Sequence, residues 1–142
     1  MKSYRTWRLK WGVVMWVEYE GNPCGTAEDD CAVRALSVVL DIDWETAYMM
    51  LANMGLMMCK IMNHNAVISA ILRQNGFYKQ TIPDSCPSCY TVEDFCKDHP
   101  NGTYVLGTGH HVVAVIDGDY IDSFDSGSDI PIYYYYRPDE GR

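Results

Sequence analysis

The spacing of the apolar residues changes part-way along the chain, and this change constrains the fold more than any other feature. Up to about residue 99 the apolar residues mostly recur at helical spacing. Four short segments rich in Val, Ile and Tyr then follow, at residues 104–106, 111–116, 119–124 and 130–135. Asp117-Gly118 separates the second segment from the third, and this dipeptide is the strongest short signal of a β-hairpin. Helices followed by a meander of antiparallel strands predict an α+β domain.

The first two-thirds of the chain predict four helices and one earlier strand. Asp29 or Asp30 can cap the first helix, which places Cys31 in its first turn. The other three helices are expected at residues 43 to about 52, 65–74, and 91 to just before 100. Residues 6–20 are rich in aromatic and β-branched types, which suits one bent strand or a short hairpin around Gly12.

Composition and charge narrow the classes of function. The 142 residues suit one domain, 1–142, and 48% apolar with 21% charged residues is typical of a globular chain. The net charge is −8, so binding of nucleic acid is not expected, although four basic residues lie in the first ten. The longest early apolar run, residues 13–17, is too short for a membrane span or a signal peptide. We therefore expect a cytoplasmic protein with reduced cysteines and no membrane partner.

A cysteine at a helix start and a histidine on a later strand form the first candidate constellation. The unpaired N–H groups of a helix N-terminus stabilise a thiolate, and Cys31 has that position. His111 is the first residue of the predicted hairpin strand and can act as the base for the Cys31 thiol. His110 should point to the opposite face of the strand. Arg34, one turn after Cys31, is expected to pair with a nearby carboxylate.

The hairpin supplies the acid that would orient the histidine. If Asp117-Gly118 are its two loop residues, His111 lies opposite Phe124, and Asp122 becomes its diagonal neighbour on the same face. A three-residue loop would instead place Asp125 opposite His111. Spacing therefore favours a triad of Cys31, His111 and Asp122, with Asp125 as the alternate.

These segments resemble a known family. Residues 30–36 (DCAVRAL), followed much later by 109–118 (GHHVVAVIDG) and 122–126 (DSFDS), are similar to small papain-like cysteine peptidase-type proteins, many of them from phages and bacteria. The acid before the cysteine resembles the bacteriocin-processing peptidases of transporters, and the compact histidine hairpin resembles small cell-wall endopeptidases. The resemblance covers roughly residues 22–136.

The resemblance implies a papain-like fold in which N-terminal helices pack on an antiparallel sheet. It also implies a thiol-dependent hydrolase that cleaves an amide or peptide bond in a peptide or protein substrate, with no cofactor in catalysis. Such peptidases commonly carry a glutamine about six residues before the cysteine as an oxyanion donor, and this chain has Cys24-Gly25-Thr26 there. The donors would be the Cys31 N–H and another group, for which Asn22 is the candidate. The alternative is an inactive papain-like module that captures a partner protein.

A second constellation combines a C-x-x-C and a C-x-x-H. Cys86 and Cys89 form the first pair, and Cys96 and His99 form the second, from the predicted short helix. Paired ligands at such spacing make small tetrahedral zinc sites. The sequence therefore predicts a structural zinc site, separate from the proposed active site. The alternatives are free thiols or a Cys86–Cys89 disulfide.

Overall fold

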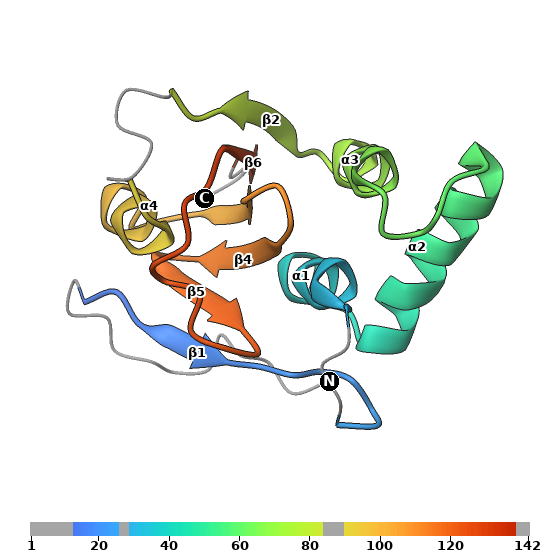
Figure 1. The fold of residues 1–142 in the computed structure, drawn as a ribbon, viewed down its shortest axis with the longest axis horizontal. Helices are drawn as coiled ribbons and strands as arrows, with labels where there is room; N and C mark the ends of the chain where they lie inside the picture. The colour runs from blue at the N-terminus through green and yellow to red at the C-terminus, as the bar shows by residue number, and fades with distance from the viewer. Residues whose placement is uncertain (1–12, 26–28, 84–89, 139–142) are drawn as a thin grey trace.

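The computed structural model describes residues 13–25, 29–83 and 90–138, and within them it has four helices and a six-stranded sheet (Figure 1). The helices are α1 (Cys31–Leu40), α2 (Trp44–Met58), α3 (Asn65–Gln74) and α4 (Val92–Asp98). The strands are β1 (Trp16–Glu18), β2 (Tyr78–Thr81), β3 (Thr103–Gly107), β4 (Val112–Ile116), β5 (Asp119–Asp122) and β6 (Tyr133–Arg137). The α+β class predicted from the sequence is confirmed. None of the helices in these ranges is long and apolar enough to cross a membrane.

The sheet has the strand order β1-β5-β4-β3-β6-β2. Strands β3, β4 and β5 form the expected antiparallel meander, but β6 returns to pair with the other edge of β3. The expectation of a wholly antiparallel sheet is wrong at one edge, because β1 pairs with β5 in parallel. The hairpin considered around Gly12 lies outside the described residues.

The β4–β5 hairpin has the predicted two-residue loop. Ile116 pairs with Asp119, and both loop residues have the positive φ angles of a type I′ turn, 49° at Asp117 and 79° at Gly118. The register that relates His111 to Asp122 therefore follows from the turn. His111 itself precedes β4, which begins at Val112 rather than at the predicted position.

The sheet is covered on both faces (Figure 1). The larger apolar cluster lies between one face and helices α1, α2 and α3, and the smaller lies between the other face and α4. Strand β4 shows why, since its alternate residues Val112, Ala114 and Ile116 belong to the first cluster and Val113 and Val115 to the second. Helix α1 is buried along most of its length because it lies between the sheet and α2.

Local features decide where two of the helices begin or end, and they explain why one strand was not predicted. The capping box between Thr91 and Asp94 starts α4 as expected. Helix α2 continues past its predicted end near Ala52 and stops at Cys59, whose left-handed backbone lets its N–H bond the last carbonyl groups. Strand β2 was not predicted, because all four of its residues are exposed and show no apolar alternation.

Candidate active site

Cys31 is the first residue of α1, as predicted, but the residue before it does not cap the helix with its side chain. The Asp30 carboxylate instead accepts hydrogen bonds from Arg34 Nη1 at 2.6 Å and from the Trp44 indole at 3.1 Å. The first-turn N–H groups therefore donate no capping hydrogen bond to the Asp30 side chain. They stay directed at whatever negative charge develops beside Cys31.

His111 is held between the Cys31 thiol and a carboxylate. Its Nε2 lies 2.6 Å from Asp122 Oδ2, and its ring also hydrogen-bonds the Cys31 thiol. Because Nε2 faces the carboxylate, Nδ1 is the ring nitrogen that interacts with the thiol. The His111 backbone oxygen accepts bonds from the N–H and hydroxyl of Thr108, and the Phe124 ring lies 5.0 Å from the imidazole.

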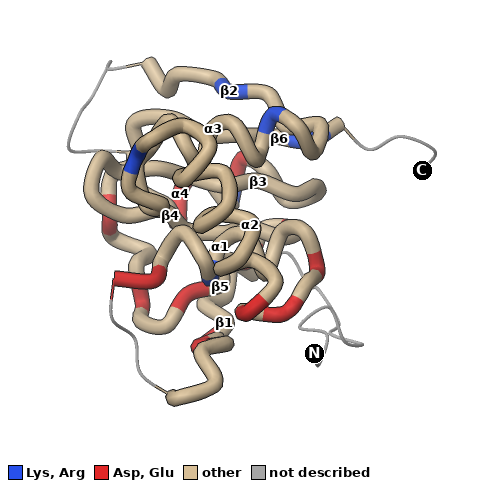
Figure 2. The backbone as a smooth tube through the Cα atoms, turned by 90° about the vertical axis from the view of Figure 1, so that its right-hand side faces the viewer, with Lys and Arg blue, Asp and Glu red and all other residues tan. Residues whose placement is uncertain are grey.

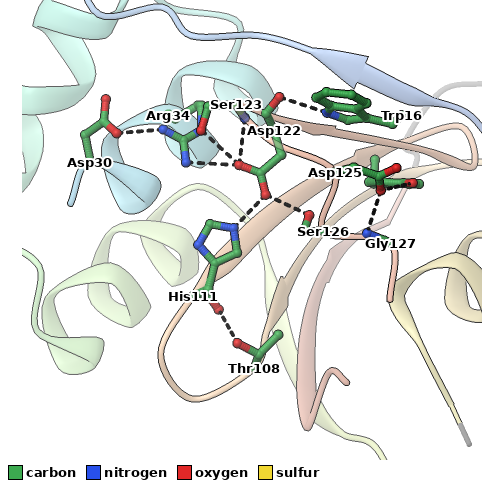
Figure 3. Close-up of polar contacts among 11 residues, drawn as sticks. Trp16, Asp30, Arg34, Thr108, His111, Asp122, Ser123, Asp125, Ser126 and Gly127 are labelled. Carbon is green, nitrogen blue, oxygen red and sulfur yellow. Dashed lines mark hydrogen bonds and ion pairs between the residues drawn. The ribbon is translucent and has the colours of Figure 1, made fainter. Parts of the chain in front are cut away.

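The Asp122 carboxylate is buried and hydrogen-bonded at both oxygens (Figure 3). Oδ1 accepts from Arg34 Nε and Nη2, at 3.2 and 3.0 Å, and from the Ser123 N–H at 2.8 Å. Oδ2 accepts from Ser126 Oγ at 2.7 Å in addition to His111. A carboxylate with this many donors stays ionised and has one orientation available.

Asp125, the alternative aspartate for orienting His111, lies away from the His111 ring. Its Oδ1 accepts a hydrogen bond from the Tyr120 hydroxyl at 2.5 Å and another from the Gly127 N–H at 3.0 Å. Figure 3 shows it turned toward Gly127 and away from the His111 ring. The structure thus brings Cys31, His111 and Asp122 together and leaves Asp125 out.

The electrostatics favour a charged thiol and imidazole. Burial raises the pKa of the Cys31 thiol. This effect is outweighed by hydrogen bonds from His111 and the Val112 backbone and by the charges of His111 and Arg34, so the pKa lies below the usual value. Burial lowers the pKa of His111, yet the hydrogen bonds and charges of Asp122 and Cys31 raise it to about 9. Burial likewise opposes the net lowering of the Asp122 pKa, which His111, Ser126 and Arg34 cause. Both shifts favour the form of the pair in which a thiolate lies beside an imidazolium.

A pocket of about 180 Å³ opens at Cys31 and His111. Its polar walls include Asn63 and Asn65, and Tyr133 supplies an aromatic wall. The volume is below that of the pockets which enclose small-molecule ligands, so it suits one side chain or a short stretch of a longer chain.

Family models, curated sequences and solved structures all give no match to the chain. What the site can do is therefore argued from its own residues.

The proposed oxyanion donor Asn22 does not line this pocket. Its carboxamide oxygen accepts a hydrogen bond from the Cys24 N–H at 2.8 Å, which fixes a turn in the loop before α1. Two other carboxamides, Asn63 and Asn65, lie in the pocket wall, and they are better placed than Asn22 to supply a second donor.

The sequence assigned no role in the site to two further residues, Ser126 and Asp30. Ser126 binds Asp122 from the loop after β5, where no periodic pattern indicates which way a side chain points. Asp30 was expected only as a cap, and its ion pair with Arg34 shares that guanidinium with Asp122. The i, i+4 spacing of Asp30 and Arg34 was the available signal.

The candidate zinc ligands are only partly within the described residues. Cys86 and Cys89 lie outside them. Cys96 is buried in the apolar cluster beneath α4, and the His99 ring stacks on Phe95 at 3.8 Å while its Nδ1 contacts the Phe95 carbonyl oxygen at 2.9 Å. The described residues alone form no group of three metal ligands, so the zinc site stays a prediction.

Zinc binding makes a measurable prediction. A site built from Cys86, Cys89, Cys96 and His99 would give one equivalent of zinc in native mass spectra. Because closing such a site contributes to folding, a chelator should then lower the melting temperature. Metal-free protein whose melting is unchanged by chelator removes the prediction.

Proposed function

We propose that the chain is a thiol-dependent hydrolase that cleaves an amide bond in a peptide or protein, with Cys31 as nucleophile, His111 as acid and base, and Asp122 as orienter. The observation that carries the proposal is the continuous chain of hydrogen bonds from thiol to imidazole to buried carboxylate, at the start of a helix and at the wall of a pocket. The arrangement of α1 against the sheet that carries His111 and Asp122 also supports a papain-like fold, which we propose with it.

The reaction follows from the positions of these groups. The Cys31 thiolate adds to the carbonyl carbon, and the N–H groups of the first turn of α1 stabilise the oxyanion. The imidazolium of His111 donates its Nδ1 proton to the amide nitrogen as the carbon–nitrogen bond breaks, and the amine leaves. Water then loses a proton to His111 and attacks the thioester, which releases the acid and restores the thiolate. Asp122 keeps the ring orientation and stabilises its charge throughout.

Reactivity of Cys31 toward iodoacetamide tests the proposal without a substrate. We expect Cys31 to be alkylated at pH 6 roughly tenfold or more faster than the exposed Cys24 and Cys59, because the thiolate is the reacting species. The His111→Ala variant should lose this advantage, whereas His110→Ala, a change at an exposed neighbour, should keep it. Mass spectrometry of tryptic peptides after timed labelling gives the rates.

The pH dependence of the same reaction adds a second readout. Between pH 6 and 8 the Cys31 rate should rise less steeply than the rate of an ordinary thiol, which rises about tenfold per pH unit toward its pKa near 8.5, because the pKa of Cys31 is lowered. Hydrolysis should fall on the alkaline side as His111 loses its proton around pH 9, since the neutral ring cannot protonate the leaving amine. Slow, uniform labelling of all accessible cysteines would overturn the enzyme proposal and favour the inactive binding module.

A further inference from the structure

Helix α2 has an apolar side that the other described residues of the chain do not cover. Its buried residues Ala47, Leu51 and Gly55 face inward, and the helix packs against α1 and α3. The outward residues are also large and apolar: Met49 is 54% exposed, Leu56 79%, Met57 78%, and Ile61 just beyond the helix 73%. Figure 1 shows α2 at the outer edge of the helical layer, and it lies on the side that faces the viewer in Figure 2. Contiguous exposed apolar surface of this kind marks an interaction site.

The order of the residues on the outward side of α2 suits contact with the same side of a second copy. Glu45, Met49, Ala52 and Leu56 follow one another at spacings of four, three and four, which places them on one stripe of the helix. Met49 and Leu56 are equally distant from the point between Ala52 and Asn53. Glu45 near the start of the helix and Lys60 just after its end are equally distant from that same point. A helix with this symmetry meets its own copy best in the antiparallel direction.

We propose that α2 is the interface of a symmetric dimer, in which the helices of two copies pack antiparallel across a two-fold axis near Ala52 and Asn53. Met49 of each copy then lies beside Leu56 of the other. Glu45 of each copy lies beside Lys60 of the other, so an ion pair forms at each end of the apolar stripe. This inference does not depend on the proposed function.

The charge distribution favours this face over the other surfaces of the chain as the place where a second copy binds. The protein carries a net charge of −8, so two copies repel each other overall. The sequence of α2 contains one acidic residue and no basic one, Asp43 caps its start, and Lys60 lies two residues past its end, so this segment carries a net charge of only −1. The pairing also aligns the two helix dipoles in opposite directions, which is favourable.

The size of the helix sets the expected strength of the dimer. Fifteen residues make a helix about 22 Å long, and one such pair lies at the lower end of specific interfaces. We therefore expect reversible dimerisation in the micromolar range. Sedimentation velocity over a concentration series of the full chain measures it.

A substitution inside the stripe tests the location of the interface. Leu56→Glu should weaken dimerisation at least tenfold, because it places a charge among apolar groups at two symmetric points. Ile132→Glu is the matched control, since Ile132 is also exposed, at 50%, but lies in the loop before β6. That control should dimerise like the unmodified chain. Circular dichroism verifies that both variants are folded.

Charge exchange tests the antiparallel arrangement itself. The Glu45→Lys variant alone brings two bases together at each end of its dimer, and the Lys60→Glu variant alone brings two acids together, so each should dimerise about threefold to tenfold more weakly at low salt. An equimolar mixture of the two variants pairs a base with an acid at both ends. The mixture should therefore associate as strongly as the unmodified chain.

Either of two results would overturn the inference. A chain that remains monomeric at concentrations well above the micromolar range has no such interface. A mixture of the two charge variants that associates no better than its components excludes the antiparallel helix pair, and a different partner protein then becomes the occupant to seek. Both charge changes are at exposed positions, so they remain informative if the Leu56 variant fails to fold.

Discussion

Replacing Asp122 with Asn should reduce the turnover of an amide substrate by about three to four orders of magnitude while the chain keeps its fold. The carboxylate accepts the Nε2 proton of His111 at 2.6 Å, which leaves Nδ1 directed at Cys31. A carboxamide can present an N–H to the ring at that place, and the imidazole then takes the wrong tautomer or turns. The variant also removes the charge that helps to hold the pKa of His111 near 9.

Asp125→Asn is the matched control for this prediction. Asp125 is three residues along the chain, is bound by Tyr120 and Gly127, and has no contact with the His111 ring among the described interactions. Its loss should leave turnover within about a factor of two or three, because it acts on the site only through screened surface electrostatics. The test compares kcat for both variants with the same substrate, and NMR titration of the His111 ring gives an independent readout. A large loss in the Asp125 variant with little in the Asp122 variant would contradict the assignment.

The relation between His111 and Asp122 could be predicted because it is local. Asp117-Gly118 fixes a two-residue turn, and strand pairing then dictates which later residues share the face of His111. The position of Cys31 was predicted for a similar reason, since the start of α1 is marked by the neighbouring acids and by apolar residues at helical spacing. Short-range rules were sufficient for both.

The features that sequence reasoning missed depend on long-range contacts. Strand β1 pairs in parallel with β5, and no local pattern indicates a partner about one hundred residues away. That pairing matters to the site, because the Trp16 indole and the Tyr19 N–H both donate to the Asp122 backbone oxygen. Asp30 illustrates a second limit. A capping bond was expected from its position, but the buried guanidinium of Arg34 competes more strongly for its carboxylate.

Arg34 links the two halves of the site, and the Arg34→Met variant should therefore be strongly destabilised. Arg34 is only 3% exposed and ion-pairs with Asp30 at 2.6 Å and Asp122 at 3.0 Å. Without it, two buried carboxylates lose their cation, although each keeps some hydrogen bonds. Removing one partner of a buried ion pair costs about 3–5 kcal/mol, so the free energy of unfolding should fall by roughly that amount.

Urea denaturation with a matched surface variant measures this effect. Arg73→Met removes an exposed arginine whose guanidinium bonds only Ser69 among the described contacts, and it should change the free energy of unfolding by less than about 1 kcal/mol. Arg34→Lys should fall between the two, because one ammonium group keeps the charge but cannot bond both carboxylates in the geometry of a guanidinium.

The pH dependence of the Arg34→Met effect separates lost ion pairs from lost packing. The pKa of Asp122 is lowered in the folded chain, so its ionic contribution is present above the pKa of the unfolded state and disappears as pH falls through the folded value. In the variant the buried Asp122 carboxylate loses the Arg34 charge that helps to lower its pKa, so acidification relieves part of the penalty. The difference in unfolding free energy between the unmodified chain and Arg34→Met should therefore shrink as pH falls from 7 toward about 4. A difference that stays constant over this range would show that Arg34 acts by packing alone and would contradict its role in holding Asp122 charged.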